Sequence, residues 1–378
     1  MKSTTVIRIG VVASVILFCI GAVGYSLARL DYAKQGANID LLELVPESSV
    51  GLLETDNLDF IMNELPHTAY SARIKDFLDT GLLSMVFKHI GQYTMSVGPH
   101  GVSNSMSQMM VSFHEPVSPE NVVVYFRTTE SSRDMMRKLV DDGGETYPPK
   151  SENYRGKTID VYPCSDGQFV ASYSGSGFLA MSHQKRLIEE VIDAHKDDDS
   201  FADHKWAGGY VSQSKQANHM MLFGRTSSLP LLATEGRSGW CDYDIHINSE
   251  VFYMGGAMHV PDSCMESLGR RLDEIAPVRE DSLLILSGQE RVDSCIMMTT
   301  ALPQHTLFDE CVANLSCDAS FIMVVDMDKV AQDPERFRPY LPQFFIKHIG
   351  IFSSFIVSVQ ISKRNDGLSH IFVFTYKE

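Results

Sequence analysis

The sequence predicts an α+β protein. Its body is expected to consist mainly of antiparallel sheets with helices on one face, built from duplicated strand-helix-strand-strand units, behind one N-terminal transmembrane helix. Three observations support this prediction: an uncharged apolar run near the N-terminus, short apolar runs joined by polar turns, and amphipathic segments between them. Apolar residues alternate with a period of two in strands and recur every three or four positions in helices.

The predicted membrane segment is residues 9–28, IGVVASVILFCIGAVGYSLA, which contain no charged side chain. A helix of this length spans about 30 Å, the thickness of the hydrocarbon core of a bilayer. The length favours an uncleaved anchor over a cleaved signal peptide, whose cut site would follow Ala28. A buried helix in a soluble protein is the third alternative. A lipoprotein signal would place small residues before Cys19, where Leu17 and Phe18 stand.

Charges on either side of the segment set its expected orientation. Lys2, Arg8 and the α-amine precede it, whereas Arg29 and Lys34, partly offset by Asp31, follow it. Positive charge is enriched on the cytoplasmic side of membrane segments. We therefore expect a single-pass protein of the cell membrane with its body on the outer, periplasmic side.

The charge of the body restricts its partners. The whole chain has a net charge of −16. Residues 1–34 carry four basic side chains and one acidic side chain, a net charge of +3, so the rest of the chain has a net charge of −19. A basic footprint is required for phosphate contacts, so the body is not expected to bind nucleic acid. It is also not expected to lie on anionic lipid headgroups, and the membrane should be contacted through the N-terminal helix.

Six cysteines lie in the body: Cys164, Cys241, Cys264, Cys295, Cys311 and Cys317. An exported body would meet an oxidising compartment, but no two of these cysteines form a CxxC pair. Sparse cysteines in a large core are usually buried small apolar residues. Cys311 and Cys317 are the pair close enough in sequence to suggest a local disulfide, and the pairing is otherwise open.

A repeat is expected within the body. The sequence KHIG occurs at Lys88 and again at Lys347, 259 positions later, and each copy precedes two predicted strands around a polar turn. A weaker third version joins MMLFG to the hairpin WCDYDIHINSEVFYMGGAMHV. We predict a membrane segment with short flanks at residues 1–34, a first α+β region at 35–260 and a second at 261–378. The second region contains a repeat of the unit at 46–113.

The helices and strands between these units have clear boundaries. Residues 263–276 predict a helix with a capping box from Ser263 to Glu266 and an apolar stripe of Met265, Leu268, Leu272 and Ile275. Residues 183–195 predict a helix capped by Ser182 that buries Leu187, Ile188 and Val191, and residues 131–144 predict a third helix. Strands are predicted at VVVYFR, TIDVY, QFVASYS and GFLAMS, the last two joined by a hairpin turn at SGSG.

Three groups of polar residues are candidate sites, and each has a plainer structural explanation. The densest group is His195, Asp197, Asp198, Asp199, Asp203 and His204, which lacks the glycine and glutamate spacing of a calcium loop and is expected to be a solvated loop. Asp242, Asp244 and His246 share one face of a predicted strand and are expected to face solvent. Ser176 lies in SGSG, without the glycine of a nucleophile elbow.

The 19 methionines include the pairs at 109–110, 135–136, 220–221 and 297–298. Flexible thioethers can line an adaptable apolar groove. In a strand, one member of a pair should face the core and the other should face outward. Core filling is therefore the preferred explanation, and a groove for lipid or peptide is the alternative.

The segment LLELVPESSVGLLETDNLDFIMNEL, directly after the membrane segment, resembles the opening of an uncharacterised family of bacterial envelope proteins. The segments GFLAMSHQKRLIEEVIDAH and WCDYDIHINSEVFYMGGAMHV are also similar to recurring patterns of that family, a domain of unknown function that is frequent in gut anaerobes. The resemblance implies an exported, membrane-tethered protein with repeated α+β units. It implies no catalytic residues.

We therefore predict a membrane-anchored envelope protein whose outer domain has a non-enzymatic binding or scaffolding role. No catalytic, cofactor-binding or metal-binding residue is assigned, and no cofactor is expected. Two alternatives are a carrier of apolar ligands, such as lipid or peptide, and a divergent hydrolase. A hydrolase would require His, Asp and Ser or Cys side chains to converge in a cleft with perturbed pKa values.

Overall fold

The computed structural model describes residues 40–56, 58, 65–72, 82–86, 88, 106–116, 118, 120–128, 148–164, 167–197, 199–204, 220–226, 239–302, 306–364 and 367–377. The predicted membrane segment at 9–28 and the predicted helix at 131–144 lie outside these residues. Among the described helices, none has both the length and the apolar character needed to cross a bilayer.

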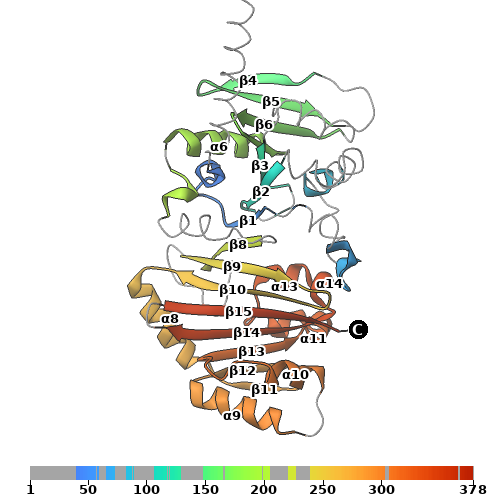
Figure 1. Cartoon of the computed structure of the whole chain (residues 1–378), viewed down its shortest axis with the longest axis vertical. Helices are drawn as coiled ribbons and strands as arrows, with labels where there is room; N and C mark the ends of the chain where they lie inside the picture. The colour runs from blue at the N-terminus through green and yellow to red at the C-terminus, as the bar shows by residue number, and fades with distance from the viewer. Residues whose placement is uncertain are drawn as a thin grey trace, which may run out of the picture.

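Fifteen strands form one antiparallel sheet, so the predicted α+β class with mainly antiparallel pairing is confirmed. In chain order they are β1 Gly51–Thr55, β2 Met106–Phe113, β3 Val122–Thr128, β4 Lys150–Tyr154, β5 Lys157–Pro163, β6 Phe169–Gly175, β7 Phe178–Ser182, β8 Met220–Arg225, β9 Trp240–Ile247, β10 Val251–His259, β11 Val278–Glu280, β12 Leu283–Ser287, β13 Phe321–Asp326, β14 Phe355–Arg364 and β15 Gly367–Tyr376. Their order across the sheet is β11-β12-β13-β14-β15-β10-β9-β8-β1-β2-β3-β7-β6-β5-β4 (Figure 1).

The helices separate and cover these strands. The α-helices are α6 Lys185–Asp197, α8 Asp262–Glu274, α9 Gln289–Thr300, α10 Leu307–Ala313, α11 Met327–Gln332, α12 Pro334–Phe337, α13 Gln343–Lys347 and α14 Ile349–Phe352. Short 3-10 helices occur at η1 Leu41–Leu44, η3 Leu65–His67 and η4 Phe201–Asp203. In Figure 1, α8 lies at one end of the strands β10, β15 and β14, whereas α11, α13 and α14 lie at the other end.

Helices cover both faces of the sheet, so the prediction that helices lie on one face is wrong. One face, here called face A, carries Val111 and Phe372 and is covered by α8 and α11 to α14 in a single core. The opposite face, here called face B, carries Met110 and Ile322 and is covered by α6 at one end and by α9 and α10 at the other. The sequence contains the reason: β7, β12 and nearly all of β13 are buried along their whole length, which requires cover on both sides.

The cover on both faces of the sheet explains the burial of one methionine pair. Met109 lies in the core on face A and its neighbour Met110 lies in the core on face B, so the expectation that one member faces outward is wrong there. Met297 and Met298, on the last turns of α9, are both exposed. The pair at 135–136 lies outside the described residues.

The predicted helix boundaries are mostly confirmed. Ser182 accepts a hydrogen bond from the backbone of Gln184 at 3.0 Å, and Leu187 and Val191 of α6 are buried. The predicted capping box at Ser263 is wrong. Helix α8 already includes Ser263, because it begins at Asp262, after Pro261, and its N-terminus has no side-chain cap. Leu268 and Leu272 are buried, whereas Met265 and Ile275 are partly buried against the same core.

The hairpins were also predicted. β6 and β7 pair from Gly175 to Phe178 around the turn at Ser176 and Gly177, whose φ of 83° favours glycine. Ser176 therefore occupies a hairpin turn. β9 and β10 form the second predicted hairpin. The polar edge strand β4 was not predicted, because its sequence KSENY lacks apolar alternation.

The strands of the predicted repeat are described in part. In the second copy β13 pairs with β14 and β14 with β15, and in the weaker version β8 pairs with β9 and β9 with β10. In the first copy β1 pairs with β2, which corresponds to the second of the two strands expected after Lys88. Helical residues at 82–86 lie between β1 and β2, and α11 to α14 lie between β13 and β14. The first strand expected after Lys88 lies outside the described residues.

The two predicted regions of the body share the sheet. The boundary at residues 260 and 261 falls between β10 and α8. Strand β10 of the first region pairs with β15 of the second over seven residue pairs, from Val251 with Thr375 to Ala257 with Ser369. Hydrogen bonds between backbones therefore cross this boundary.

A glycine in β10 allows two neighbouring strands to interact across it. Gly256 pairs with His370 of β15, and the imidazole Nε2 of His370 donates a hydrogen bond to the carbonyl oxygen of Asp242 in β9 at 3.0 Å. The ring of His370 also lies 4.5 Å from the ring of Tyr243. A Cβ atom on Gly256 would stand 2.0 Å from the carbonyl oxygen of Asp242, so only glycine fits.

We predict that Gly256→Ala lowers the free energy of unfolding by about 1–3 kcal/mol, because the added Cβ must displace backbone. Urea unfolding followed by circular dichroism measures this change. Gly255→Ala is the matched control, since its Cβ would make an ordinary 3.7 Å contact with Ile371. Equal effects of the two substitutions would contradict the packing argument.

Candidate functional site

Between its two cores, face B has a stretch that no helix of the described ranges covers. The core under α6 ends at Met221, Phe223 and Trp240, and the core under α9 and α10 ends at Ile356 of β14. In the strands between them, Asp244 and His246 of β9, Tyr253 and Gly255 of β10, and Ile371 and Val373 of β15 are exposed or half-buried on this face. On face A the same strands are continuously packed.

Strand β15 makes the asymmetry clear. His370, Phe372 and Phe374 point to face A and are buried, whereas Ile371 and Val373 alternate with them and point to face B. Ile371 is 42% exposed. Tyr253 of the neighbouring strand β10 is exposed on the same face, so Ile371 belongs to a small apolar patch.

We call this surface the open face and define it by Asp244, His246, Tyr253, Gly255, Ile371 and Val373. Tyr253 is 38% exposed, and its ring is stacked on that of His246 at 4.6 Å with an interplanar angle of 14°. His246 Nε2 lies 3.1 Å from Asp244 Oδ2. The open face therefore presents an apolar half at Tyr253 and Ile371 beside a polar half at Asp244.

The structure separates the three polar residues that the sequence grouped on this strand. Asp244 and His246 face solvent as expected, but Asp242 is buried and the expectation is wrong for it. Asp242 Oδ1 accepts hydrogen bonds from the backbone nitrogen of Ala257 at 3.1 Å and from His259 Nε2 at 2.6 Å. Two donors on β10 thus provide hydrogen bonds to the buried carboxylate of Asp242, which the sequence pattern had predicted to face solvent.

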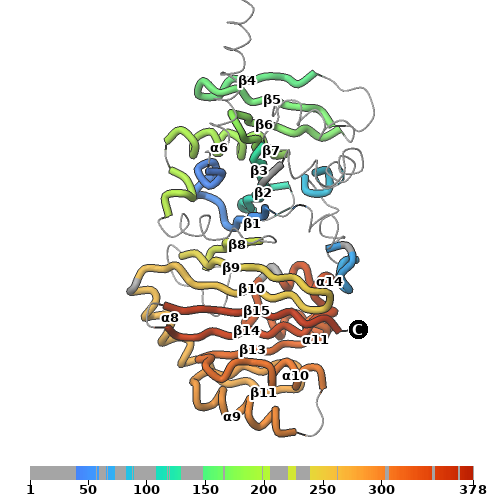
Figure 2. The backbone as a smooth tube through the Cα atoms, viewed as in Figure 1, coloured from blue at the N-terminus to red at the C-terminus, as the bar shows by residue number. Residues whose placement is uncertain are grey.

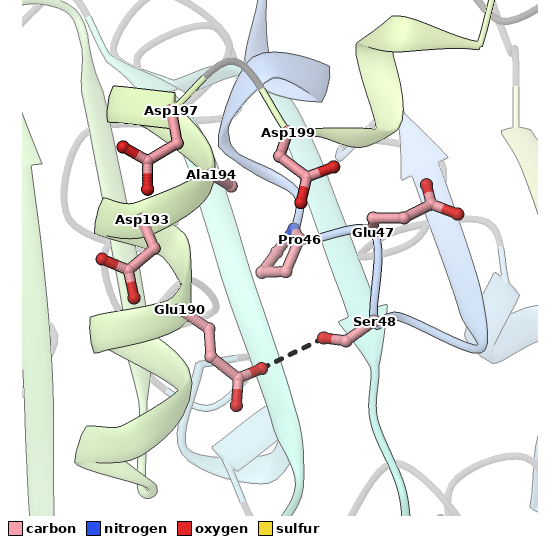
Figure 3. A pocket seen from close by; sticks show the side chains of 8 residues that line it. All are labelled: Pro46, Glu47, Ser48, Glu190, Asp193, Ala194, Asp197 and Asp199. Atoms are coloured by element: carbon pink, nitrogen blue, oxygen red, sulfur yellow. Dashed lines mark hydrogen bonds between the residues drawn. The ribbon is translucent and has the colours of Figure 1, made fainter.

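A hollow of about 210 Å³ lies elsewhere on face B, between α6 and the segment before β1 (Figure 3). Its walls include the carboxylates of Glu47, Glu190, Asp193, Asp197 and Asp199. Four of them have polar or cationic partners nearby. Arg155 binds Asp193 and Asp197, each at 2.6 Å, and Ser48 donates a hydrogen bond to Glu190 at 3.1 Å.

This hollow includes part of the acidic group that the sequence singled out. Hydrogen bonding to Arg155 lowers the pKa of Asp197 below its usual value. His195 points away from the hollow's carboxylates toward Tyr173, with its Nδ1 3.0 Å from the phenolic oxygen. Asp203 caps its own turn by accepting from the backbone of Ser200 at 2.9 Å. Asp198 lies outside the described residues.

His204, the last member of the group, lies 2.9 Å from Glu47. Within the described ranges, no set of three or more His, Cys, Asp or Glu side chains is arranged to hold a metal ion. The six body cysteines are free thiols, and the predicted local pair consists of a buried Cys311 and an exposed Cys317.

One serine–histidine pair occurs in β2 and the residue that follows it. Ser112 Oγ lies 2.8 Å from His114 Nε2 and 3.0 Å from the hydroxyl of Tyr125. Ser112 is fully buried, and burial lowers the pKa of His114 to about 4. A nucleophile must reach its substrate and its base must accept a proton near neutral pH, so this pair is better explained as a satisfied polar contact in the core.

Glu54 is a buried carboxyl whose surroundings raise its pKa. It lies in β1, is 8% exposed and accepts a hydrogen bond from Gln108, which in turn accepts one from Arg127 at 3.0 Å. Burial, reinforced by the nearby charges of Asp40 and Asp56, raises the pKa of Glu54 to about 7. A carboxyl that titrates near neutral pH lies beside the pairing of β1 with β8.

The comparisons with known proteins give only distant similarities. No protein-family model matches the chain, and no curated protein matches it. Three crystal structures of TP0453, in forms I, IV and III, are similar to it with sequence identities of 9%, 10% and 10% and TM-scores of 0.34, 0.31 and 0.30. Each alignment covers 65% of this chain and 90% of the other. A likeness this distant identifies neither a family nor a function.

We predict that Glu54→Gln changes how stability depends on pH. The folded-state pKa of about 7 is above the ordinary value of 4.5, so the natural protein loses stability as pH rises from 4.5 through 7. The glutamine variant lacks this loss and gains up to about 3 kcal/mol relative to the natural protein between pH 5 and pH 8. Urea unfolding at both pH values measures the difference.

The control for this experiment is Glu266→Gln, which changes an exposed carboxylate on α8. It should leave the pH dependence of the natural protein unchanged. If both variants follow the same pH profile as the natural protein, ionisation of Glu54 is not coupled to folding.

Proposed function

We propose that the chain is a single-pass, membrane-anchored protein of the bacterial cell envelope that binds another macromolecule through its body on the periplasmic side. The open face carries this proposal, because Tyr253 and Ile371 stand exposed on a sheet face that is covered by helices on both sides of them. A binding or scaffolding role requires such a preformed surface and no catalytic group.

Sequence features support the location. The uncharged run at residues 9–28 has the length of a transmembrane helix, and the positive charges before it favour a cytoplasmic N-terminus. The strongly acidic body would remain clear of anionic headgroups, as a tethered outer domain requires. The resemblance to bacterial envelope proteins is consistent with this location.

We also propose that the body arose from duplicated strand-helix-strand-strand units. Each copy begins with a strand that is followed by helical residues and ends with a strand, β1 and β2 in the first copy and β13 and β15 in the second. Lys88 and Lys347, the first residues of the two KHIG sequences, both fall in this helical part. Duplication explains how one chain extends a sheet to such a width.

Cys317 provides a test of location. It is the exposed cysteine of the body, so a membrane-impermeant maleimide added to intact spheroplasts should label it if the body is outside. The variant Cys317→Ser should lose most of the label. Labelling of the natural protein only after lysis would place the body in the cytoplasm and contradict the proposal.

A photoreactive amino acid at Ile371 tests binding. In native membranes we expect irradiation to cross-link this position to a second macromolecule, because Ile371 is an exposed apolar residue of the open face. The same photoreactive residue at Met298, an exposed apolar position on α9, is the control. Absence of a cross-link at Ile371, or equal products at both positions, would contradict binding through the open face.

A further inference from the structure

The open face has the dimensions of a seat for one helix. It spans three strands, β9, β10 and β15, and neighbouring strands lie about 4.8 Å apart, so its width is about 14 Å. An α-helix with its side chains is about 10–12 Å across. A single helix therefore fits between the two helical layers of face B.

Those layers form the two sides of the seat. On one side, Cys311 and Val312 of α10 pack in the same core as Ile356 of β14, which places α10 at the border. On the other side, Phe201 of η4 packs on Trp240 of β9 with ring centroids 4.8 Å apart. Both neighbouring parts of face B are thus covered by helical segments that place apolar side chains on the strands.

The floor suits the apolar side of an amphipathic helix. Tyr253, Ile371 and Val373 provide contact area, and the side chain of Ile371 lies beside Gly255 of β10. A helix packs on a sheet through one apolar stripe, as α6 does here with Leu187 and Val191. The open face offers the complement of such a stripe.

Charge selects among amphipathic helices. The chain without residues 1–34 has a net charge of −19. Asp244 lies on the floor itself, and Glu310, on the first turn of the bordering α10, is exposed. An incoming helix with lysine or arginine on its polar side is attracted by this field, whereas an acidic helix is repelled.

We propose that the open face binds an amphipathic α-helix with a basic polar side, supplied by a partner protein. This inference rests on the proposed binding function and names the class of partner. The helix lies between α10 and η4, with its apolar stripe on Tyr253 and Ile371 and its basic residues near Asp244 and Glu310.

A synthetic helical peptide of leucine and lysine, about 18 residues or five turns long, is the probe. It is labelled with a fluorophore and titrated with the full-length protein in neutral detergent, and its anisotropy is recorded. A scrambled peptide of the same composition and a leucine–glutamate peptide with the same apolar stripe are compared with it. We expect the amphipathic basic peptide to bind about tenfold more tightly than either.

Variants locate the binding site. Ile371→Ser should weaken binding of the basic amphipathic peptide about tenfold, because it removes an exposed apolar side chain from the floor of the seat. Met298→Ser, which removes an exposed apolar side chain from α9, is the matched control and should leave affinity unchanged. Unfolding in urea verifies that both variants remain folded, and Asp244→Asn, which removes charge alone, should weaken binding by a smaller factor.

Each outcome has a distinct meaning. Equal binding of the amphipathic and scrambled basic peptides would indicate attraction to charge alone and would overturn the inference. Loss of affinity in Met298→Ser but not in Ile371→Ser would show that the peptide does not bind at the open face and would overturn the inference. If the peptide does not bind while the cross-link at Ile371 in membranes persists, the helical partner is wrong and the binding function stands. If both fail, the proposed function fails as well.

Discussion

The pairing of β1 with β8 joins the body into one sheet. Five residue pairs, from Gly51 with Gly224 to Thr55 with Met220, connect the strands that lead to β4 on one side with those that lead to β11 on the other. Figure 2 shows this contact between segments far apart in the chain, with β1 in blue and β8 in yellow-green. The core of face A continues across it, because Val111 and Tyr243 belong to the same packed cluster. Exposed strand edges are prone to unwanted pairing, so joining two edges here also removes both.

The cores differ on the two faces, and this difference generates the candidate site. On face A, α8, the helices α11 to α14 and the helical residues at 82–86 cover the sheet in one cluster. On face B, α6 covers one end, α9 and α10 cover the other, and β9, β10 and β15 remain open between them. Because a sheet must bury one face to be stable but can leave part of the other in water, this arrangement exposes apolar side chains without a gap in the main core.

Much of the local structure could be predicted from the sequence. The hairpins around Gly177 and between β9 and β10, and the apolar stripe of α6, follow from short-range periodicity and turn residues. Apart from the capping box at Ser263, which is a local error, the predictions that were wrong depended on distant neighbours. Asp242 was expected in water, but β10 places Ala257 and His259 against it. Met110 was expected either inside or outside, but cover on both faces buries it together with Met109.

The candidate site shows where sequence reasoning ends. Residues 367–376 predict a strand with two unlike faces, and both faces contain apolar residues, Phe372 on one and Ile371 on the other. By itself the sequence determined the strands, the amphipathic helices and a run of membrane-spanning length, because each depends on residues close together in the chain. Only the tertiary structure decided that the helices of the described residues leave the face with Ile371 uncovered, since that depends on where α6 and α10 pack, and those helices are separated from β15 by long stretches of chain.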